Sequence, residues 1–501
     1  MSNAAISPAD PVTPPPLRRV PDWAILAVVC LGQFMVILDV SIVNVALPSI
    51  RNDLHFTSSG LQWIVNAYTI VFAGFLLLGG RAADLFGQRR LFLLGMFLFT
   101  AASLVGGFAQ SRGMLIAARS AQGLGGAVLS PATLTILTTT FREGPARAKA
   151  LGAWSAVAGA GGAAGALLGG ILTDFLSWRW ILFVNVPIGV IGMLAARLVL
   201  AERKGTADNR SLDVVGAILV TGGLLSLVSG IVESDSKGWT SSTTVVLLIA
   251  GAALLALFVA YEARFAKAPL MPLRLFRSRS VTASNCVMFF LGAATFAMWY
   301  FLSLYVQNIL GYSPLGAGLV FLPQTVAIIL GAQVSSRLVW RMGPRPLLIV
   351  GGAVTTIGLA WLAAVPVHGS YLPNIFVPSV LTTLGIGLSF TPIAMAATSG
   401  VAPQDAGLAS GLVNTMRQVG GSLGLAVLAT VAVDHTTSLL KAGHAPKAAL
   451  VSGYDRAFLG GAILAVGCII AALALPRKPT TVATTEVVAD ESLPTGSLVT
   501  E

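Results

Sequence analysis

The fold of this chain is decided by the stretch Gly80-Arg81-Ala82-Ala83-Asp84-Leu85-Phe86-Gly87-Gln88-Arg89-Arg90, which lies between two long apolar runs. An altered copy, again between apolar runs, follows 256 residues later as Ser336-Arg337-Leu338-Val339-Trp340-Arg341-Met342-Gly343-Pro344-Arg345-Pro346. Three positions keep their residue type: Arg81 and Arg337, Gly87 and Gly343, Arg89 and Arg345. A basic link repeated between apolar runs is typical of a duplicated bundle of membrane helices. We therefore expect two related halves embedded in a bilayer.

The composition excludes a water-soluble chain. Of the 501 residues, 55% are apolar and 10% are charged, and the mean hydropathy is +0.83. A soluble protein of this length could not bury so much apolar surface, so lipid must act as the solvent. The net charge of +11 comes mainly from basic residues in the links, which is typical of membrane proteins and gives no support to a nucleic-acid partner. The predicted fold class is therefore all-α integral membrane.

Apolar runs of about 20 residues, the length that spans a bilayer, predict fourteen transmembrane helices. The seventh run ends beside the polar residues Glu233, Asp235 and Lys237. The predicted spans are 23–48, 60–80, 90–110, 113–138, 148–171, 179–200, 211–232, 243–263, 281–305, 313–336, 346–366, 373–398, 406–433 and 455–476.

The distribution of lysine and arginine predicts the orientation of the chain. With the N-terminus inside, basic residues favour the inner links over the outer ones by roughly three to one, as the positive-inside rule requires. We therefore expect a multi-pass protein of the plasma membrane with both termini in the cytoplasm. The first 22 residues lack the charged, apolar and cleavage segments of a signal peptide.

Further glycine matches extend the repeat. Gly123-Leu124-Gly125 resembles Gly385-Ile386-Gly387 at an offset of 262, and four glycines recur at an offset of 259: Gly152, Gly161, Gly162 and Gly165 as Gly411, Gly420, Gly421 and Gly424. An even number of crossings separates the matched spans, so the two repeats run parallel. The predicted organisation is a disordered cytoplasmic tail (1–22), a six-helix bundle (23–202), inserted helices 7 and 8 with linkers (203–270), a second six-helix bundle (271–476) and a second disordered cytoplasmic tail (477–501).

Asp39 is the only acid well inside a predicted span. It lies ~21 Å into the first helix, in the outer half of a hydrocarbon core ~30 Å thick. A charge there is costly and by default functional, and a buried carboxyl suits reversible protonation. Arg119 lies ~8 Å below the outer boundary in the fourth span, at nearly the same depth. A pair that forms in one conformation and is broken by protonation would couple protons to movement.

Other roles remain open for these residues. Asp39 could be a structural carboxylate bonded to nearby backbone or to Asn44, and Arg119 could form a permanent salt bridge or extend outward to the interface. Arg417 lies near mid-membrane in the thirteenth span with no acid on its own helix. It could meet an anionic substrate group, bond helix-end carbonyls or pair across the bundle.

Three further sets of residues are expected to shape movement or binding. The glycines that offer a bare helix face for tight packing, and a possible seal between the halves, are Gly161, Gly165, Gly169 and Gly170. A charged latch at the inner face, or simple orientation by positive charge, is expected from Gly80, Arg81, Asp84, Gly87, Arg89 and Arg90. Aromatic residues gather in the ninth span, where a subset can line an apolar cavity; the candidate cavity residues are Gln122, Phe296, Trp299, Tyr300 and Arg417.

ATP-driven transport and enzymatic function find no support. The sequence has no phosphate-binding loop and no soluble region large enough for a nucleotide domain. The four histidines fall in predicted outer loops and the three cysteines in separate apolar runs, so no metal site or nucleophile constellation emerges. We expect no enzyme, no metal and no cofactor, with a proton gradient as the energy source.

The residues resemble the major facilitator superfamily, and within it the 14-span drug:proton antiporter branch of the EmrB/QacA kind. The resemblance covers the chain apart from its tails. That branch's first-helix signature is similar to the stretch Leu38-Asp39-Val40-Ser41-Ile42-Val43-Asn44-Val45-Ala46-Leu47-Pro48. The superfamily's loop motif between helices 2 and 3 resembles Gly80 to Arg90. Arg119, Gln122, Gly123 and Gly125 match its fourth-helix proton-transfer motif. Two further stretches resemble sequences of this branch: Trp178-Arg179-Trp180 and Asn185-Val186-Pro187-Ile188-Gly189.

The chain departs from the family pattern at two positions. The fifth-helix antiporter motif carries Gly-Pro, whereas here Gly165 is followed by Ala166. Without the proline an expected kink is missing, which puts the motif's hinge role in doubt. Trp340 replaces the acid in the second copy of the loop motif, so the two latches cannot work equivalently.

The resemblance implies the major facilitator fold, with two parallel six-helix repeats plus two inserted helices. It also implies a proton-coupled multidrug or antibiotic exporter that exchanges external protons for an amphiphilic small molecule by alternating access. Acids deep in spans are scarce, which favours neutral, anionic or amphiphilic substrates over dications. A metabolite carrier of different direction or coupling, and a membrane sensor or scaffold without transport, are the alternatives.

Overall fold

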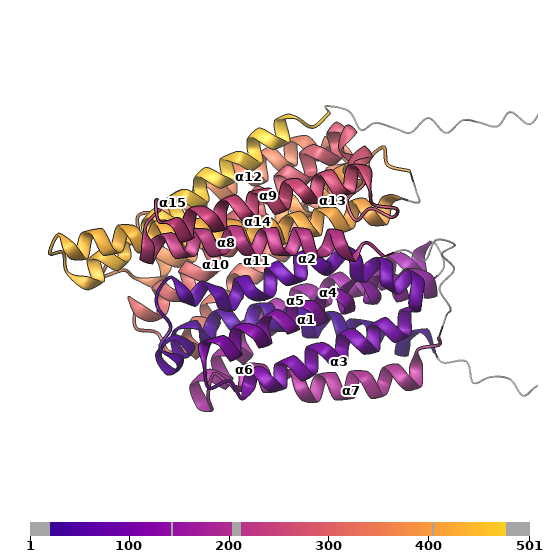
Figure 1. Cartoon of the computed structure of the whole chain (residues 1–501), viewed down its shortest axis with the longest axis horizontal. Helices are drawn as coiled ribbons and strands as arrows, with labels where there is room; N and C mark the ends of the chain where they lie inside the picture. The colour runs from indigo at the N-terminus through magenta and orange to yellow at the C-terminus, as the bar shows by residue number, and fades with distance from the viewer. Residues whose placement is uncertain (1–20, 142–143, 203–211, 403–404, 477–501) are drawn as a thin grey trace, which may run out of the picture.

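The computed structural model describes residues 21–141, 144–202, 212–402 and 405–476, and the regular elements in this part of the chain are all helices (Figure 1). The predicted tails, apart from residues 21 and 22, lie outside the described residues. The elements are α1 (Asp22–Leu54), η1 (Gly60–Gln62), α2 (Trp63–Phe86), α3 (Gln88–Gly107), α4 (Arg112–Thr140), α5 (Pro145–Phe175), α6 (Trp180–Phe183), α7 (Asn185–Val199), α8 (Val214–Lys237), α9 (Ser242–Arg264), η2 (Leu273–Arg277), α10 (Arg279–Asn308), α11 (Pro314–Met342), α12 (Pro344–Leu362), η3 (Leu372–Phe376), α13 (Val377–Thr398), α14 (Ala406–Lys441) and α15 (Pro446–Leu473).

Within the described residues, twelve helices are long and apolar enough to cross a membrane. They include α8 and α9, where helices 7 and 8 were predicted. The count of fourteen is not confirmed, because the predicted spans 113–138 and 148–171 are not among these twelve. The first corresponds to α4, which carries Arg119 and other buried polar groups. The second corresponds to α5 (Pro145–Phe175), several of whose side chains before Ala160 lie outside the described residues.

The repeated basic stretch is helical rather than a loop. Helix α2 continues to Phe86 and α3 begins at Gln88, so only Gly87 separates them. Gly87 has φ +102° and Gly343, between α11 and α12, has φ +76°. A residue without a Cβ adopts this backbone conformation at no steric cost, which explains glycine in both copies. We call the end of the bundle where α2 meets α3 the Gly87 end. The opposite end, where His55 follows the last residue of α1, is called the His55 end.

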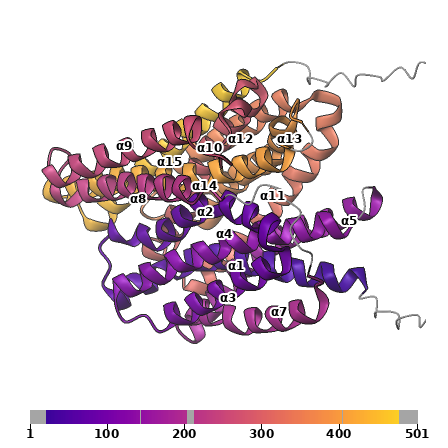
Figure 2. The ribbon, with the colours of Figure 1, turned by 45° about the vertical axis from the view of Figure 1, so that its right-hand side comes forward.

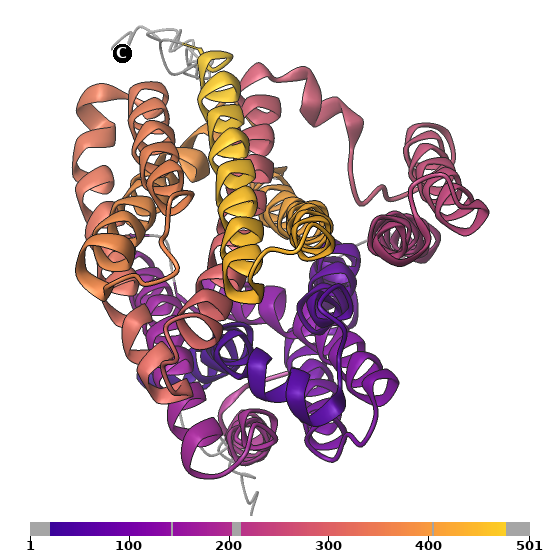
Figure 3. The same ribbon diagram turned by 90° about the vertical axis from the view of Figure 1, so that its left-hand side faces the viewer.

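The helices pair in a repeated pattern. The close pairs α2–α4, α3–α4 and α1–α5 recur in the same order as α11–α13, α12–α13 and α10–α14. In Figure 1 the helices α1 to α7 lie below and α10 to α15 lie above. Figure 3 shows α8 and α9 at one side of the molecule, and α8 contacts α2 and α14.

Glycine contacts carry the same repeat, and they correct one predicted match. A Cβ on Gly123 would meet Tyr68 O of α2, whereas one on Gly385 would lie 2.5 Å from Gly351 O of α12. The counterpart of Gly385 in the N-terminal half is Gly125, because a Cβ on Gly125 would lie 3.0 Å from Gly95 O of α3. The predicted offset of 262 therefore joins glycines that face non-equivalent helices, because a two-residue shift moves a position by 200° around a helix.

The two halves meet at the His55 end. Ser303 Oγ of α10 donates to Asn44 O of α1 at 2.6 Å, and Gln307 Nε2 donates to Val45 O at 2.9 Å. On the opposite side a Cβ on Gly170 of α5 would lie 2.7 Å from Pro314 O of α11. We call these contacts, together with the approach of Gly318 to Ala166 O, the seal.

Toward the Gly87 end, α5 keeps its contact with α4, where Trp154 Nε1 donates to Thr133 Oγ1 at 3.2 Å, but positions on another face of α5 have no close neighbour. A Cβ on Gly152 or Gly162 would meet nothing within 4 Å, and Ala156 is exposed. Figure 2 shows this part of α5 projecting from the bundle. The bundle is therefore closed between α5 and α11 at one end and open between them at the other.

A buried carboxylate network as candidate functional site

Asp39 lies in the interior of the N-terminal half with its side chain enclosed. It is 0% exposed and accepts hydrogen bonds from three side chains on two other helices. Arg119 Nη1 and Gln122 Nε2, both on α4, donate at 2.5 Å and 3.0 Å, and Asn185 Nδ2 at the start of α7 donates at 3.0 Å. Asn44, the alternative partner, donates instead to Val40 O at 3.1 Å. The carboxylate therefore ties α1 to α4 and α7.

Arg119 is held from several directions and is 2% exposed. Its Nε donates to Ile64 O at 3.1 Å and its Nη1 also donates to Gln122 Oε1 at 2.8 Å. The guanidinium lies over the Tyr68 ring, 4.6 Å from its centroid. The alternative in which Arg119 extends outward to the interface is therefore wrong for this conformation. A permanent salt bridge and a pair that opens on protonation both fit the geometry.

Ser103 contacts the side-chain amides of Gln122 and Asn185 and orients them. Gln122 Nε2 donates to Ser103 Oγ of α3 at 2.6 Å, and Asn185 Nδ2 lies 3.4 Å from the same oxygen. Ser103 and Tyr68 were not singled out in the sequence, and Asn185 was noted only as part of a family-like stretch. The sequence marks these residues only as polar side chains among apolar neighbours. Many buried serines and asparagines without a functional role show the same pattern, so it does not single these residues out.

The charges in this network balance. One carboxylate and one guanidinium are buried together, and the remaining members are neutral. Pairing offsets the cost of removing both ions from water, but loss of either partner would leave the other uncompensated. Protonation of Asp39 would remove the charge that faces Arg119, while Gln122 and Ile64 O would still bind the guanidinium. The guanidinium therefore has partners besides the carboxylate.

Arg417 of α14 is half-buried, and its Nη2 donates to Asn414 Oδ1 at 3.0 Å. Its Nε is buried and has no hydrogen-bond partner in the described part of the chain. Among the described residues no carboxylate forms an ion pair with Arg417, so the predicted alternative of pairing across the bundle is not seen. Arg417 lies within electrostatic range of Tyr68, whose buried hydroxyl also has no partner.

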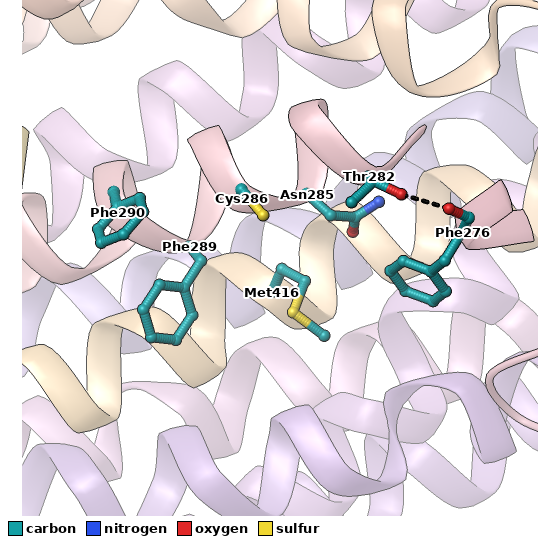
Figure 4. Close-up of a pocket in the computed structure, with 7 residues that line it drawn as sticks. All are labelled: Phe276, Thr282, Asn285, Cys286, Phe289, Phe290 and Met416. Atoms are coloured by element: carbon teal, nitrogen blue, oxygen red, sulfur yellow. Dashed lines mark hydrogen bonds between the residues drawn. The ribbon is translucent and has the colours of Figure 1, made fainter. Parts of the chain in front are cut away.

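None of the predicted cavity residues lines the pocket that the described residues form between α10, η2 and α14. Gln122 belongs to the Asp39 network, and Phe296 packs on α14, where a Cβ at Gly421 would lie 2.8 Å from its ring. Trp299 contacts Phe321 with ring centroids 5.0 Å apart, and Tyr300 is 2% exposed in the core. A pocket with a volume of about 330 Å³ is instead formed by other residues of α10, η2 and α14 (Figure 4).

The candidate latch residues lie around the α2–α3 junction. Arg89 Nη2 donates to Arg197 O at 2.9 Å, and Arg90 Nε lies 3.7 Å from Glu202. These contacts tie the start of α3 to the end of α7 and the residues after it. Arg81 is half-buried, and a Cβ on Gly80 would lie 3.5 Å from Pro131 Cβ. The side chain of Asp84 lies outside the described residues.

The predicted glycine ladder packs α5 against α1 and α11. A Cβ on Gly165 would lie 2.7 Å from Leu38 O, and one on Gly169 would lie 2.8 Å from Ile42 O. Gly161 faces the Ile37 side chain at 3.2 Å. Gly170 faces α11 and forms part of the seal. The ladder therefore contacts the segment of α1 that carries Asp39.

Solved structures show the same fold at low sequence identity. A bacterial homologue of the human lysosomal transporter Spinster, crystallised in an inward-facing and unoccupied conformation, superposes with a TM-score of 0.64. The alignment covers 92% of this chain and 98% of that one at 16% identity. The human organic anion transporter MFSD10 gives a TM-score of 0.57 over 89% of this chain and 99% of that one, at 15% identity.

Sequence relatives cover nearly the whole chain. The cephamycin export protein CmcT of Amycolatopsis lactamdurans is 45% identical over 90% of this chain and 92% of its own length. The puromycin resistance protein pur8 of Streptomyces alboniger is 38% identical over 89% of both chains. Residues 29–425 match the model of the Major Facilitator Superfamily. This multi-pass membrane protein therefore belongs to the major facilitator superfamily, whose members are transporters and not enzymes.

Proposed function

We propose that the protein is a proton-coupled exporter of amphiphilic drugs or antibiotics, which exchanges external protons for its substrate by alternating access. The observation that carries the coupling is the buried pair of Asp39 and Arg119, because an ionisable residue deep in a membrane span is costly and by default suggests a functional role. Export is supported by relatives named for the export of cephamycin and for resistance to puromycin and lincomycin. Over most of its length the chain is similar to these proteins.

The proposed topology has fourteen spans with both termini in the cytoplasm. The bias of lysine and arginine toward the Gly87 end supports this orientation. Helices α4 and α5 count as spans in this proposal, because the polar groups in the middle of α4 are enclosed by neighbouring helices and α5 runs for 31 residues. The two six-helix bundles cover 23–202 and 271–476, and 203–270 holds the inserted pair. The structure then corresponds to a conformation that is closed outside and open between α5 and α11 inside.

Coupling follows from the place of Asp39 beside the seal. Residues 41–45 of α1 bond α5 through Ser41 Oγ to Gly162 O at 2.7 Å, and they bond α10 through Asn44 O and Val45 O. The same helix is tied to α4 through Asp39. In this conformation the carboxylate is paired with Arg119, as expected after its proton has left toward the cytoplasm. Protonation from outside would release that tie and let α1 move with the seal.

The substrate class follows from the charges that face the middle of the bundle. Arg417 has an unsatisfied Nε and no ion-pair partner among the described residues, so it suits a ligand with a hydrogen-bond acceptor or a negative charge. Neutral, anionic or zwitterionic amphiphiles are therefore the proposed substrates. The energy source is the proton gradient, with neither a cofactor nor ATP.

The test is accumulation of a varied panel of antibiotics and fluorescent compounds in an efflux-deficient bacterium. Wild type, Asp39→Asn and an empty vector are compared with and without a protonophore, after protein levels in the membrane have been matched. We expect lower accumulation only with wild type and an intact gradient. Export by Asp39→Asn that remains sensitive to the protonophore would sink the coupling role of Asp39. Equal accumulation in all strains across the panel would instead favour a metabolite carrier or a non-transporting sensor.

A further inference from the structure

A pocket lies apart from the carboxylate network, between α10, η2 and α14. Its volume is about 330 Å³, and it is lined by Phe276, Thr282, Asn285, Cys286, Phe289, Phe290 and Met416 (Figure 4). Three phenyl rings, a thioether and a thiol make the lining apolar, and none of the lining residues carries a formal charge. Such a surface favours an uncharged ligand that can pack against aromatic rings.

One polar atom of the lining has no partner. Asn285 is 3% exposed, and its Nδ2 donates to Val281 O at 2.8 Å. That bond fixes the orientation of the amide, because a carbonyl oxygen accepts only from the NH₂ group. Asn285 Oδ1 is therefore left buried without a hydrogen bond. Figure 4 shows it directed toward the space between Met416 and Phe276.

The wall of the pocket that η2 forms, which includes Phe276, is held in place by hydrogen bonds within the protein. Thr282 Oγ1 donates to Phe276 O at 2.7 Å, so its hydroxyl fixes the wall. Arg274 of η2 donates to both oxygens of Asp405 at 2.8 Å, and this fork ties η2 to the start of α14. These bonds fix the backbone of the wall, so only side chains need to move for a ligand's donor to reach Asn285 Oδ1, which is buried in this structure.

We propose that this pocket binds an uncharged aromatic molecule that carries a single hydrogen-bond donor. The rings pack among Phe276, Phe289 and Met416, and the donor satisfies Asn285 Oδ1, which no described side chain or backbone group reaches. A buried acceptor without a partner is costly, so a ligand that supplies the donor gains over one that does not. The site is distinct from the Asp39 network, and the proposal does not depend on export.

Occupancy can be read at Cys286, which is exposed and belongs to the lining. Cys30 and Cys468 are replaced by alanine, and the protein is reconstituted in phosphatidylcholine nanodiscs. The rate of biotin-maleimide labelling is measured with N-phenyl-1-naphthylamine, which has one N–H donor, and with its N-methyl derivative, which has none. We expect the first compound to protect Cys286 at concentrations about three- to tenfold lower, the gain from one net hydrogen bond.

Two variants make this comparison decisive. In Asn285→Leu both compounds should protect Cys286 at the same concentration, because the acceptor is gone while the apolar lining remains. In a variant that keeps only Cys30, neither compound should slow labelling, which controls for partition into lipid. Equal protection by both compounds in the parent protein would overturn the proposal and indicate a crevice filled by hydrocarbon. Absence of protection, or a preference that persists in Asn285→Leu, would overturn it as well.

Discussion

At the scale of single residues, Asp39 must be both buried and satisfied. Removing a carboxylate from water costs free energy. Here three hydrogen-bond donors offset that cost, and one of them, Arg119, also carries a positive charge. The contribution of each donor differs. Gln122 and Asn185 are neutral and share Ser103, whereas Arg119 alone balances the charge. The consequences of losing Arg119 should therefore be electrostatic more than geometric.

We predict that Arg119→Ala destabilises the protein by about 3–5 kcal/mol, because it leaves an uncompensated buried charge. Adding Asp39→Asn to this variant should recover much of the loss, since both charges are then absent. Export should be abolished in the single and the double variant alike. Thermal unfolding of the purified proteins in detergent measures the first effect, and drug accumulation measures the second. A double variant as unstable as Arg119→Ala would contradict the electrostatic explanation.

At the scale of elements, the glycine face of α5 and the chain of α1 fit through backbone contacts. Gly165 leaves no room for a Cβ beside Leu38 O, and Ser41 Oγ donates to Gly162 O at 2.7 Å. In a regular helix Gly162 O also accepts from the N–H of Ala166. That carbonyl therefore has a second donor, from α1, at the position where the family motif would carry proline. Ser41 would satisfy Gly162 O if the N–H of residue 166 were missing.

We predict that Ala166→Pro costs less than the ~3 kcal/mol typical of proline inside a helix, because Ser41 keeps Gly162 O satisfied. The double variant Ser41→Ala/Ala166→Pro should lose more stability than its two single variants added together. The control is Ser41→Ala, which should lose about 0.5–1.5 kcal/mol for one hydrogen bond. Strict additivity in a double-mutant cycle of thermal unfolding would show that Ser41 does not compensate for the proline.

At the scale of the whole molecule, contacts between the halves decide the conformation. The seal joins α1 to α10 and α5 to α11, and each pair includes one helix from each half. Gly318 packs so closely on Ala166 O that a Cβ could not be accommodated without movement. The seal is therefore sensitive to a single methyl group, while the interior of each half does not depend on it.

We predict that Gly318→Ala opens the seal and lowers export several-fold while the protein still folds. Spin labels at Asn52 and His444, both exposed at the His55 end and on opposite halves, should move further apart. The native cysteines are replaced in this background. Gly222→Ala is the matched control, because a Cβ there would meet only Leu254 Cδ1 at the ordinary distance of 3.8 Å. An unchanged label distance in Gly318→Ala would contradict the role of this contact.

The number of spans shows where reading the sequence reached its limit. Helices α8 and α9 have the long apolar runs that lipid requires, and the sequence predicted both. Helix α4 carries Arg119, Gln122 and Ser130, which are affordable only because other helices enclose them. Hydropathy reports each residue's preference for lipid, whereas burial in a bundle depends on which helices are neighbours. Composition along one helix therefore could not settle the count.

The sequence by itself determined the membrane class and the duplication, because hydropathy and repeated motifs can be read from the order of the residues alone. It also placed Asp39 and Arg119 at one depth, since the rise per residue is fixed. Only the tertiary structure decided that Asn185 and Ser103 complete the network, that Gly125 and not Gly123 corresponds to Gly385, and that the seal lies beside Asp39. These facts depend on the rotation and approach of helices far apart in the chain. Packing between side chains sets that rotation, and no local pattern encodes it.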